Sequence, residues 1–219
     1  MRAFSLSLAL LALTLPACAR SQTAAADGER EQQRPLSSLA AQRLVVLPVQ
    51  YLREADSLGW ASAAGSPREY LRTVDSEITF AVKGRGVESM WVFAEQIARS
   101  AKRNSGYAAD PYALAAQSLR PGVKRKQELL REPLATQLRS LVAFTEARYA
   151  LLPVELRFER GGGSDGAVGR AVLHLVLVDA RRSRPVWAIE VASDPAQRFS
   201  PALAASVAEH LADLVAEPN

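Results

Sequence analysis

One histidine and two glutamates in the C-terminal part of the chain are the residues best suited to proton transfer. His174 lies between Leu173 and Leu175, in an apolar run that predicts a strand. It could act as a general base if it faced a cleft together with Glu155 or Glu190. These three residues can meet only if the register of their strands places them on one face of a sheet. The alternative is a half-buried histidine that has a structural hydrogen-bond partner.

Two well-defined motifs for metal-dependent and phosphate-dependent catalysis are missing from the sequence. It contains no His-Glu-x-x-His and no phosphate loop that ends in Gly-Lys-Ser/Thr. The 219 residues include two histidines and one cysteine, so soft metal ligands are scarce, and we predict no metal site and no cofactor. We therefore expect a protein without a catalytic site, and an enzyme that uses Glu155, Glu190 and His174 is the alternative.

Two clusters of basic residues are candidates for contact with an anionic surface. They comprise Lys124, Arg125 and Lys126, and then Arg181, Arg182 and Arg184. Such clusters can contact anionic lipid headgroups or the phosphates of lipopolysaccharide, and the alternative is solvated loop charge. The whole chain has 27 Lys+Arg against 23 Asp+Glu, which is too mild an excess for a dedicated nucleic-acid binder, so we predict no nucleic-acid partner.

Two aromatic residues, Trp91 and Phe93, lie between Gly86 and a predicted helix. They could form an exposed apolar patch that binds a partner protein. The alternative is that both pack in the core.

The first 17 residues have the composition of a secretory signal. Arg2 supplies the positive charge, and the uncharged run from Phe4 to Leu15 is too short for a helix that stays in the bilayer. Cys18, the single cysteine, follows directly after Leu15-Pro16-Ala17. The alternative is an ordinary signal peptide that is cleaved after Ala19.

The segment Leu15-Pro16-Ala17-Cys18 resembles the lipobox of bacterial lipoproteins. The resemblance implies that the Cys18 thiol carries a diacylglyceryl group and that cleavage makes Cys18 the first residue of the mature chain. Several acyl chains on one terminus give stable anchoring, where a single chain does not. The implied location is the periplasmic side of the bacterial cell envelope, and Ala19 after the cysteine favours the outer membrane.

Residues 18–42 are predicted to form a flexible tether, and residues 43–217 a single domain. The tether is rich in Ala, Ser, Gln, Glu and Arg and lacks aromatic residues, so it cannot bury enough apolar surface to offset the entropy of ordering. The length of the remainder is typical of one domain.

The domain is predicted to be α/β (α+β), with helices packed on a mixed sheet of about four strands. Strands are expected at 43–50, 147–158, 170–179 and 185–192, and residues 87–93 are expected to form either a short strand or an extended packing segment. Helices are expected at 70–82, with Thr73 or Asp75 as the cap, and at 93–104, and others begin at Asp110-Pro111, Pro133 and Ser200-Pro201. The first strand should pair in parallel with the second through a right-handed crossover, and the last three should form an antiparallel meander.

Two of the predicted strands share a six-residue pattern. Leu44–Val49 and Tyr149–Val154 both end in Leu-Pro-Val. Proline lacks an N–H donor, so Pro48 and Pro153 predict two matched positions where strand pairing is interrupted.

The domain resembles a group of envelope lipoprotein domains. The group includes the curli-secretion lipoprotein, the lipoprotein activator of penicillin-binding proteins and the amino-terminal domain of the Tol–Pal translocation protein. Residues 44–49, 170–179 and 186–187 carry the resemblance. It implies a small α/β domain that binds another envelope protein, and a lipid or glycan pocket beneath the Gly161–Gly169 loop is a further alternative.

Overall fold

The computed structural model describes residues 36–122, 129–161 and 168–216. Within them, six strands form one sheet: β1 Leu44–Val46, β2 Tyr51–Leu52, β3 Trp91–Val92, β4 Tyr149–Arg160, β5 Gly169–Asp179 and β6 Arg184–Ala192. The strand order is β3-β1-β4-β5-β6, and β2 pairs with β4 beyond the end of β1. The predicted signal sequence, and the tether up to residue 35, lie outside the described residues.

The pairing of the strands confirms the predicted mixed sheet. β1 is parallel to β4, whereas β4, β5 and β6 form the antiparallel meander. The sheet has two more strands than the four predicted: β3 lies in residues 87–93, for which a short strand was one expectation, and β2 has two residues, too few to show a hydrophobic period.

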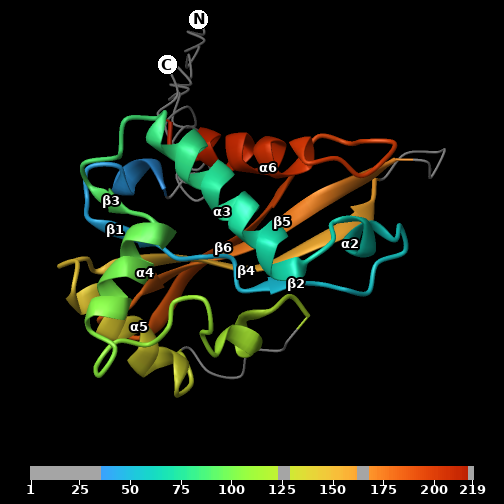
Figure 1. Ribbon diagram of the computed structural model, residues 1–219. Helices are drawn as coiled ribbons and strands as arrows, with labels where there is room; N and C mark the ends of the chain where they lie inside the picture. The colour runs from blue at the N-terminus through green and yellow to red at the C-terminus, as the bar shows by residue number, and fades with distance from the viewer. Residues whose placement is uncertain (1–35, 123–128, 162–167, 217–219) are drawn as a thin grey trace, which may run out of the picture. The chain divides into compact units, whose positions relative to one another are not determined.

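Helices cover both faces of the sheet (Figure 1). On the first face α3 (Pro67–Lys83) packs along α6 (Ala202–Asp213), and the short α2 (Trp60–Ala63) lies over β4. On the second face lie α4 (Ala94–Arg103), the 3-10 turn η2 (Ala116–Leu119) and α5 (Leu134–Ala143). No helix among the described residues is long and apolar enough to span a bilayer.

The domain begins before the predicted boundary at residue 43. Leu36 is fully buried and Leu39 is 6% exposed, and both belong to the core of the first face. A 3-10 turn, η1 (Ser37–Leu39), places the Leu39 carbonyl where it accepts a 3.1 Å hydrogen bond from Trp91 Nε1. The end of the predicted tether is therefore part of the folded domain.

Two predicted helix starts were wrong. Helix α3 begins at Pro67 with Ser66 as its N-cap, so Thr73 and Asp75, the predicted caps, lie within it. The described segment after Asp110-Pro111 does not continue as a helix, because the Gln50 side chain bonds it instead: Gln50 donates to the Pro111 carbonyl at 2.9 Å and accepts from the Leu114 N–H at 3.0 Å.

The two prolines of the repeated pattern interrupt the sheet, as predicted. β1 ends at Val46 and β2 begins at Tyr51, so Pro48 lies in the break between them. In β4 the register against β5 shifts between Pro153 and Glu155. The shift places Glu155 on the second face of the sheet, the face that also carries His174.

Candidate functional site

The three residues considered for proton transfer lie in one row across the sheet. The register pairs Glu155 on β4 with His174 on β5, and His174 with Glu190 on β6. Residues paired in this way share a face, and His174 Nδ1 lies 3.8 Å from Glu190 Oε1. The geometric condition for the enzyme alternative is therefore met.

Both glutamates of this row form ion pairs with arginine side chains. Arg53 and Arg120 each donate to one carboxylate oxygen of Glu155, which is fully buried. Arg157 donates to both oxygens of Glu190 at 2.8 Å, and these hydrogen bonds lower the pKa of Glu190. Both glutamates are therefore engaged in ion pairs. Such pairs are better suited to holding strands and loops together than to transferring protons.

Trp91 and Phe93 do not form an exposed aromatic patch. Trp91 is 2% exposed and Phe93 is 1% exposed, so neither is available to a partner. Trp91 bonds to Leu39 through its indole nitrogen, and Phe93 lies under the Lys83 ammonium at 5.5 Å from the ring centre. Both residues pack in the core, which was the alternative.

The structure describes only one of the two basic clusters. Lys124, Arg125 and Lys126 lie outside the described residues. Arg181, Arg182 and Arg184 are exposed, at and just after the turn between β5 and β6. Contact of either cluster with a partner stays a prediction.

The turn between β5 and β6 borders a hollow of about 330 Å³, which we call the arginine hollow. Its lining residues are Arg148, Tyr149, Asp179, Arg182, Arg184, Pro185 and Val186. Three arginines face a single carboxylate, so the lining has a net positive charge. Arg148 was not among the predicted site residues, because only the pairing of Tyr149 with Asp179 brings the start of β4 beside this turn.

Asp179 organises the arginine hollow. Its side chain is 4% exposed, and its Oδ2 accepts from Arg148 Nε at 2.9 Å and Nη2 at 2.6 Å. Burial opposes ionisation of Asp179, but the bonds from Arg148 and from the Arg182 N–H outweigh it, and its pKa is lowered. The Arg148 guanidinium also lies 4.9 Å from the centre of the Tyr149 ring. Arg148 is thereby held at the edge of the hollow, where its side chain stays 44% exposed.

One catalytic motif was overlooked in the sequence. Residues 162–166 read Gly-Gly-Ser-Asp-Gly, which has the Gly-x-Ser-x-Gly spacing of a nucleophile elbow. An elbow joins a strand to a helix, whereas this segment joins β4 to β5, which are antiparallel neighbours. The segment itself lies outside the described residues, and the order of the elements does not support an elbow.

Metal binding finds no support in the described part of the chain. No group of three or more His, Cys, Asp or Glu residues there is arranged to hold an ion. The residues that converge at the arginine hollow are suited to binding an anion.

The structure resembles several solved structures, all with low TM-scores. The PelC dodecamer from Paraburkholderia phytofirmans is 12% identical, covers 81% of this chain and 91% of its own, and has a TM-score of 0.37. The C-terminal domain of LpoB from Salmonella enterica is 16% identical, covers 74% and 96%, and has a TM-score of 0.35. Lipoprotein GNA1162 from Neisseria meningitidis is 11% identical, covers 78% and 96%, and has a TM-score of 0.35.

No family model matches the sequence, and no curated protein matches it. At TM-scores of 0.35 to 0.37, the likenesses carry no conclusion about what this chain does.

Proposed function

We propose that this chain is a lipid-anchored envelope protein that acts as a non-catalytic binding module for an anionic envelope component. The observation that carries the binding role is the arginine hollow, where Arg148, Arg182 and Arg184 surround one buried carboxylate. Cys18 supplies the anchor, and residues 19–35 supply the spacer between lipid and domain.

The charge of the hollow supports an anionic ligand. Asp179 accepts hydrogen bonds from the Arg148 side chain and from the Arg182 N–H, so it holds Arg148 in place at the edge of the hollow, while the Arg182 side chain remains exposed. Arg182 is 75% exposed, and its guanidinium lies 3.9 Å from Asp179. Guanidinium groups bind phosphate and carboxylate oxygens in a planar, two-pronged geometry. The location follows from the anchor. Lipidation at Cys18 would place the chain on the periplasmic side of the envelope, and Ala19 favours the outer membrane.

Anchoring and binding can be tested separately. For the anchor, the mass of the purified mature protein should correspond to a chain that begins at an acylated Cys18. An unmodified thiol, or a chain that begins at Arg20, would contradict the proposal.

For binding, the Cys18→Ser protein, which cannot be lipidated, is mixed with vesicles that contain or lack phosphatidylglycerol. We expect binding only to the anionic vesicles, and Arg182→Gln/Arg184→Gln should weaken it by about 30-fold, since each surface arginine contributes about 1 kcal/mol. The control, Arg99→Gln/Arg103→Gln, removes the same charge from α4 and should retain affinity. An equal loss in both double variants would mean that overall charge, not the hollow, attracts the vesicles.

A further inference from the structure

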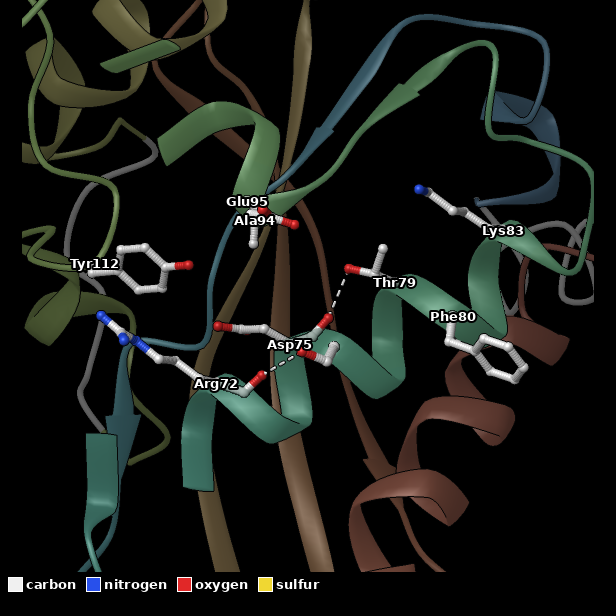
Figure 2. A pocket seen from close by; sticks show the side chains of 9 residues that line it. Arg72, Asp75, Thr79, Phe80, Lys83, Ala94, Glu95 and Tyr112 are labelled. Carbon is white, nitrogen blue, oxygen red and sulfur yellow. Dashed lines mark hydrogen bonds between the residues drawn. The ribbon is translucent and has the colours of Figure 1, made fainter. Parts of the chain in front are cut away.

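A second hollow lies beside helix α3 and shares no lining residue with the arginine hollow (Figure 2). Its volume is about 520 Å³, which is within the range of small-molecule sites. Helix α3 forms one wall, and the start of α4 and Tyr112 form the rest. The lining residues are Arg72, Asp75, Ser76, Thr79, Phe80, Lys83, Ala94, Glu95 and Tyr112.

Asp75 is the unusual residue of this hollow. It is 8% exposed, and its Oδ1 accepts a 2.8 Å hydrogen bond from the Val49 N–H. Its Oδ2 is also buried and has no hydrogen-bond partner among the described residues. Figure 2 shows the Asp75 side chain extending from α3 toward the side where Tyr112 lies. A buried acceptor without a donor costs about 1–3 kcal/mol of stability. No described residue supplies a donor for Asp75 Oδ2.

The surroundings of Asp75 carry both signs of charge. Arg72 lies with its guanidinium 5.6 Å from the centre of the Tyr112 ring, on the same side of α3 as Asp75. A neighbouring hollow of about 370 Å³ shares Arg72, Asp75 and Tyr112 and runs on toward β2. The charged and titratable groups that line the two hollows around Asp75 are Arg68, Arg72 and Lys83 from α3, Glu95 from α4, Glu54 after β2, Tyr51 on β2, and Asp110 and Tyr112 from the loop.

We propose that this cavity binds the free amino end of a short peptide, whose ammonium group donates to Asp75 Oδ2. The basic side chains of Arg72 and Lys83 then face the carboxylate or the carbonyl groups of the same peptide. A simple anion fits less well, because Asp75 and Glu95 would repel it. Phe80, 76% exposed at the rim, offers apolar surface to a side chain of the peptide.

Proton release should accompany this binding. Burial raises the pKa of Asp75 to about 7, against the lowering effects of the Val49 N–H and of Arg72, so the empty carboxyl is partly protonated at neutral pH. An ammonium group favours the ionised carboxylate, so peptide binding expels the proton. The affinity should therefore rise from about pH 6 to a maximum near pH 7.5, and fall above it because the peptide amine, with a pKa of about 8, then loses its own proton.

Calorimetry on the purified full-length protein tests the proposal with trialanine, N-acetyl-trialanine and trialanine amide as probes. We expect saturable binding of trialanine, a loss of about tenfold or more on acetylation, and a smaller loss on amidation. Titration in two buffers of different ionisation enthalpy should show protons released at about pH 7. Equal affinity for the acetylated peptide, or no binding of any probe up to about 10 mM, would overturn the proposal.

Two variants locate the binding site. Asp75→Asn should lose as much affinity for trialanine as acetylation costs, and it should abolish the proton release. Glu88→Gln removes an exposed carboxylate that lines neither hollow, and it should bind trialanine within about twofold of the native protein. Retained affinity in Asp75→Asn would contradict the proposal, and if that variant fails to fold, the acetylation series on the native protein still decides.

Discussion

The Arg139 guanidinium donates a 2.7 Å hydrogen bond to Ser183 Oγ, and so ties helix α5 to the turn between β5 and β6. Ser183 has φ of 51°, in the left-handed region that costs energy for any residue except glycine. The Leu130 N–H donates to the Ser183 carbonyl at 2.7 Å. Contacts from outside the turn therefore hold Ser183 in its left-handed conformation, between the exposed Arg182 and Arg184.

Removing the hydroxyl of Ser183 should loosen this turn. We expect Ser183→Ala to lower the free energy of unfolding by about 1 kcal/mol, the net contribution of one hydrogen bond. Urea denaturation measures the change. The control is Ser62→Ala, at an exposed position of α2, which should stay within about 0.5 kcal/mol of the native protein.

Asp75 should make the protein less stable as the pH rises. Its folded pKa of about 7 exceeds the unfolded value of about 3.9, so the folded protein binds more protons between these values. The free energy of unfolding should therefore fall by about 3 kcal/mol from about pH 5 to pH 8 because of this group. Asp75→Asn removes this contribution, so its stability relative to the native protein should increase across the same range. Parallel curves for the two proteins in urea denaturation would contradict the assignment.

Glu155 should be costly to neutralise. It is fully buried, while its partners Arg53 and Arg120 keep side chains that are 37% and 36% exposed. Glu155→Gln leaves both arginines without their anion, and we expect a loss of about 2–4 kcal/mol in the free energy of unfolding. Glu209→Gln, which breaks an exposed pair with Arg85, is the matched control and should cost less than about 1 kcal/mol. Similar losses in the two variants would mean that burial of the Glu155 pairs adds nothing.

Gly169 at the start of β5 has no room for a side chain. An added Cβ would lie 2.5 Å from Leu58 Cδ1 and 2.7 Å from the Trp60 ring, so in Gly169→Ala the side chains of Leu58 and Trp60 must move away. We expect Gly169→Ala to lower the free energy of unfolding by about 1–3 kcal/mol. Gly106→Ala, where an added Cβ meets nothing within 4 Å, should lower stability by less than about 0.5 kcal/mol in the same thermal or chemical denaturation.

The long elements of the fold were predictable from sequence, because their hydrophobic patterns are long. The apolar run at 170–179 predicted the strand β5, and the two Leu-Pro-Val segments predicted the interruptions at Pro48 and Pro153. Elements fixed by tertiary contacts were not predictable. Gln50 bonds the backbone after Asp110-Pro111 and prevents the expected helix.

The sites were predictable only in part. Sequence analysis named Arg181, Arg182 and Arg184, since clustered charge is visible in a sequence. The position of Arg148 at the arginine hollow depends on the register between β4 and β5, which a local sequence pattern does not specify. Asp75 was predicted as a helix cap because the start signal further upstream, Ser66-Pro67 followed by Glu69, was missed, although it has the capping-box spacing with proline at the first helical position.

The parallel pairing of β1 with β4 has a consequence for the order of folding. Leu44 pairs with Tyr149, whereas β4, β5 and β6 are connected as successive hairpins. During synthesis β1 emerges first, yet its partner strand follows only after all of the intervening helices. Contacts between near neighbours in sequence form fastest, so we expect the C-terminal meander to nucleate folding and the amino-terminal strand to dock last.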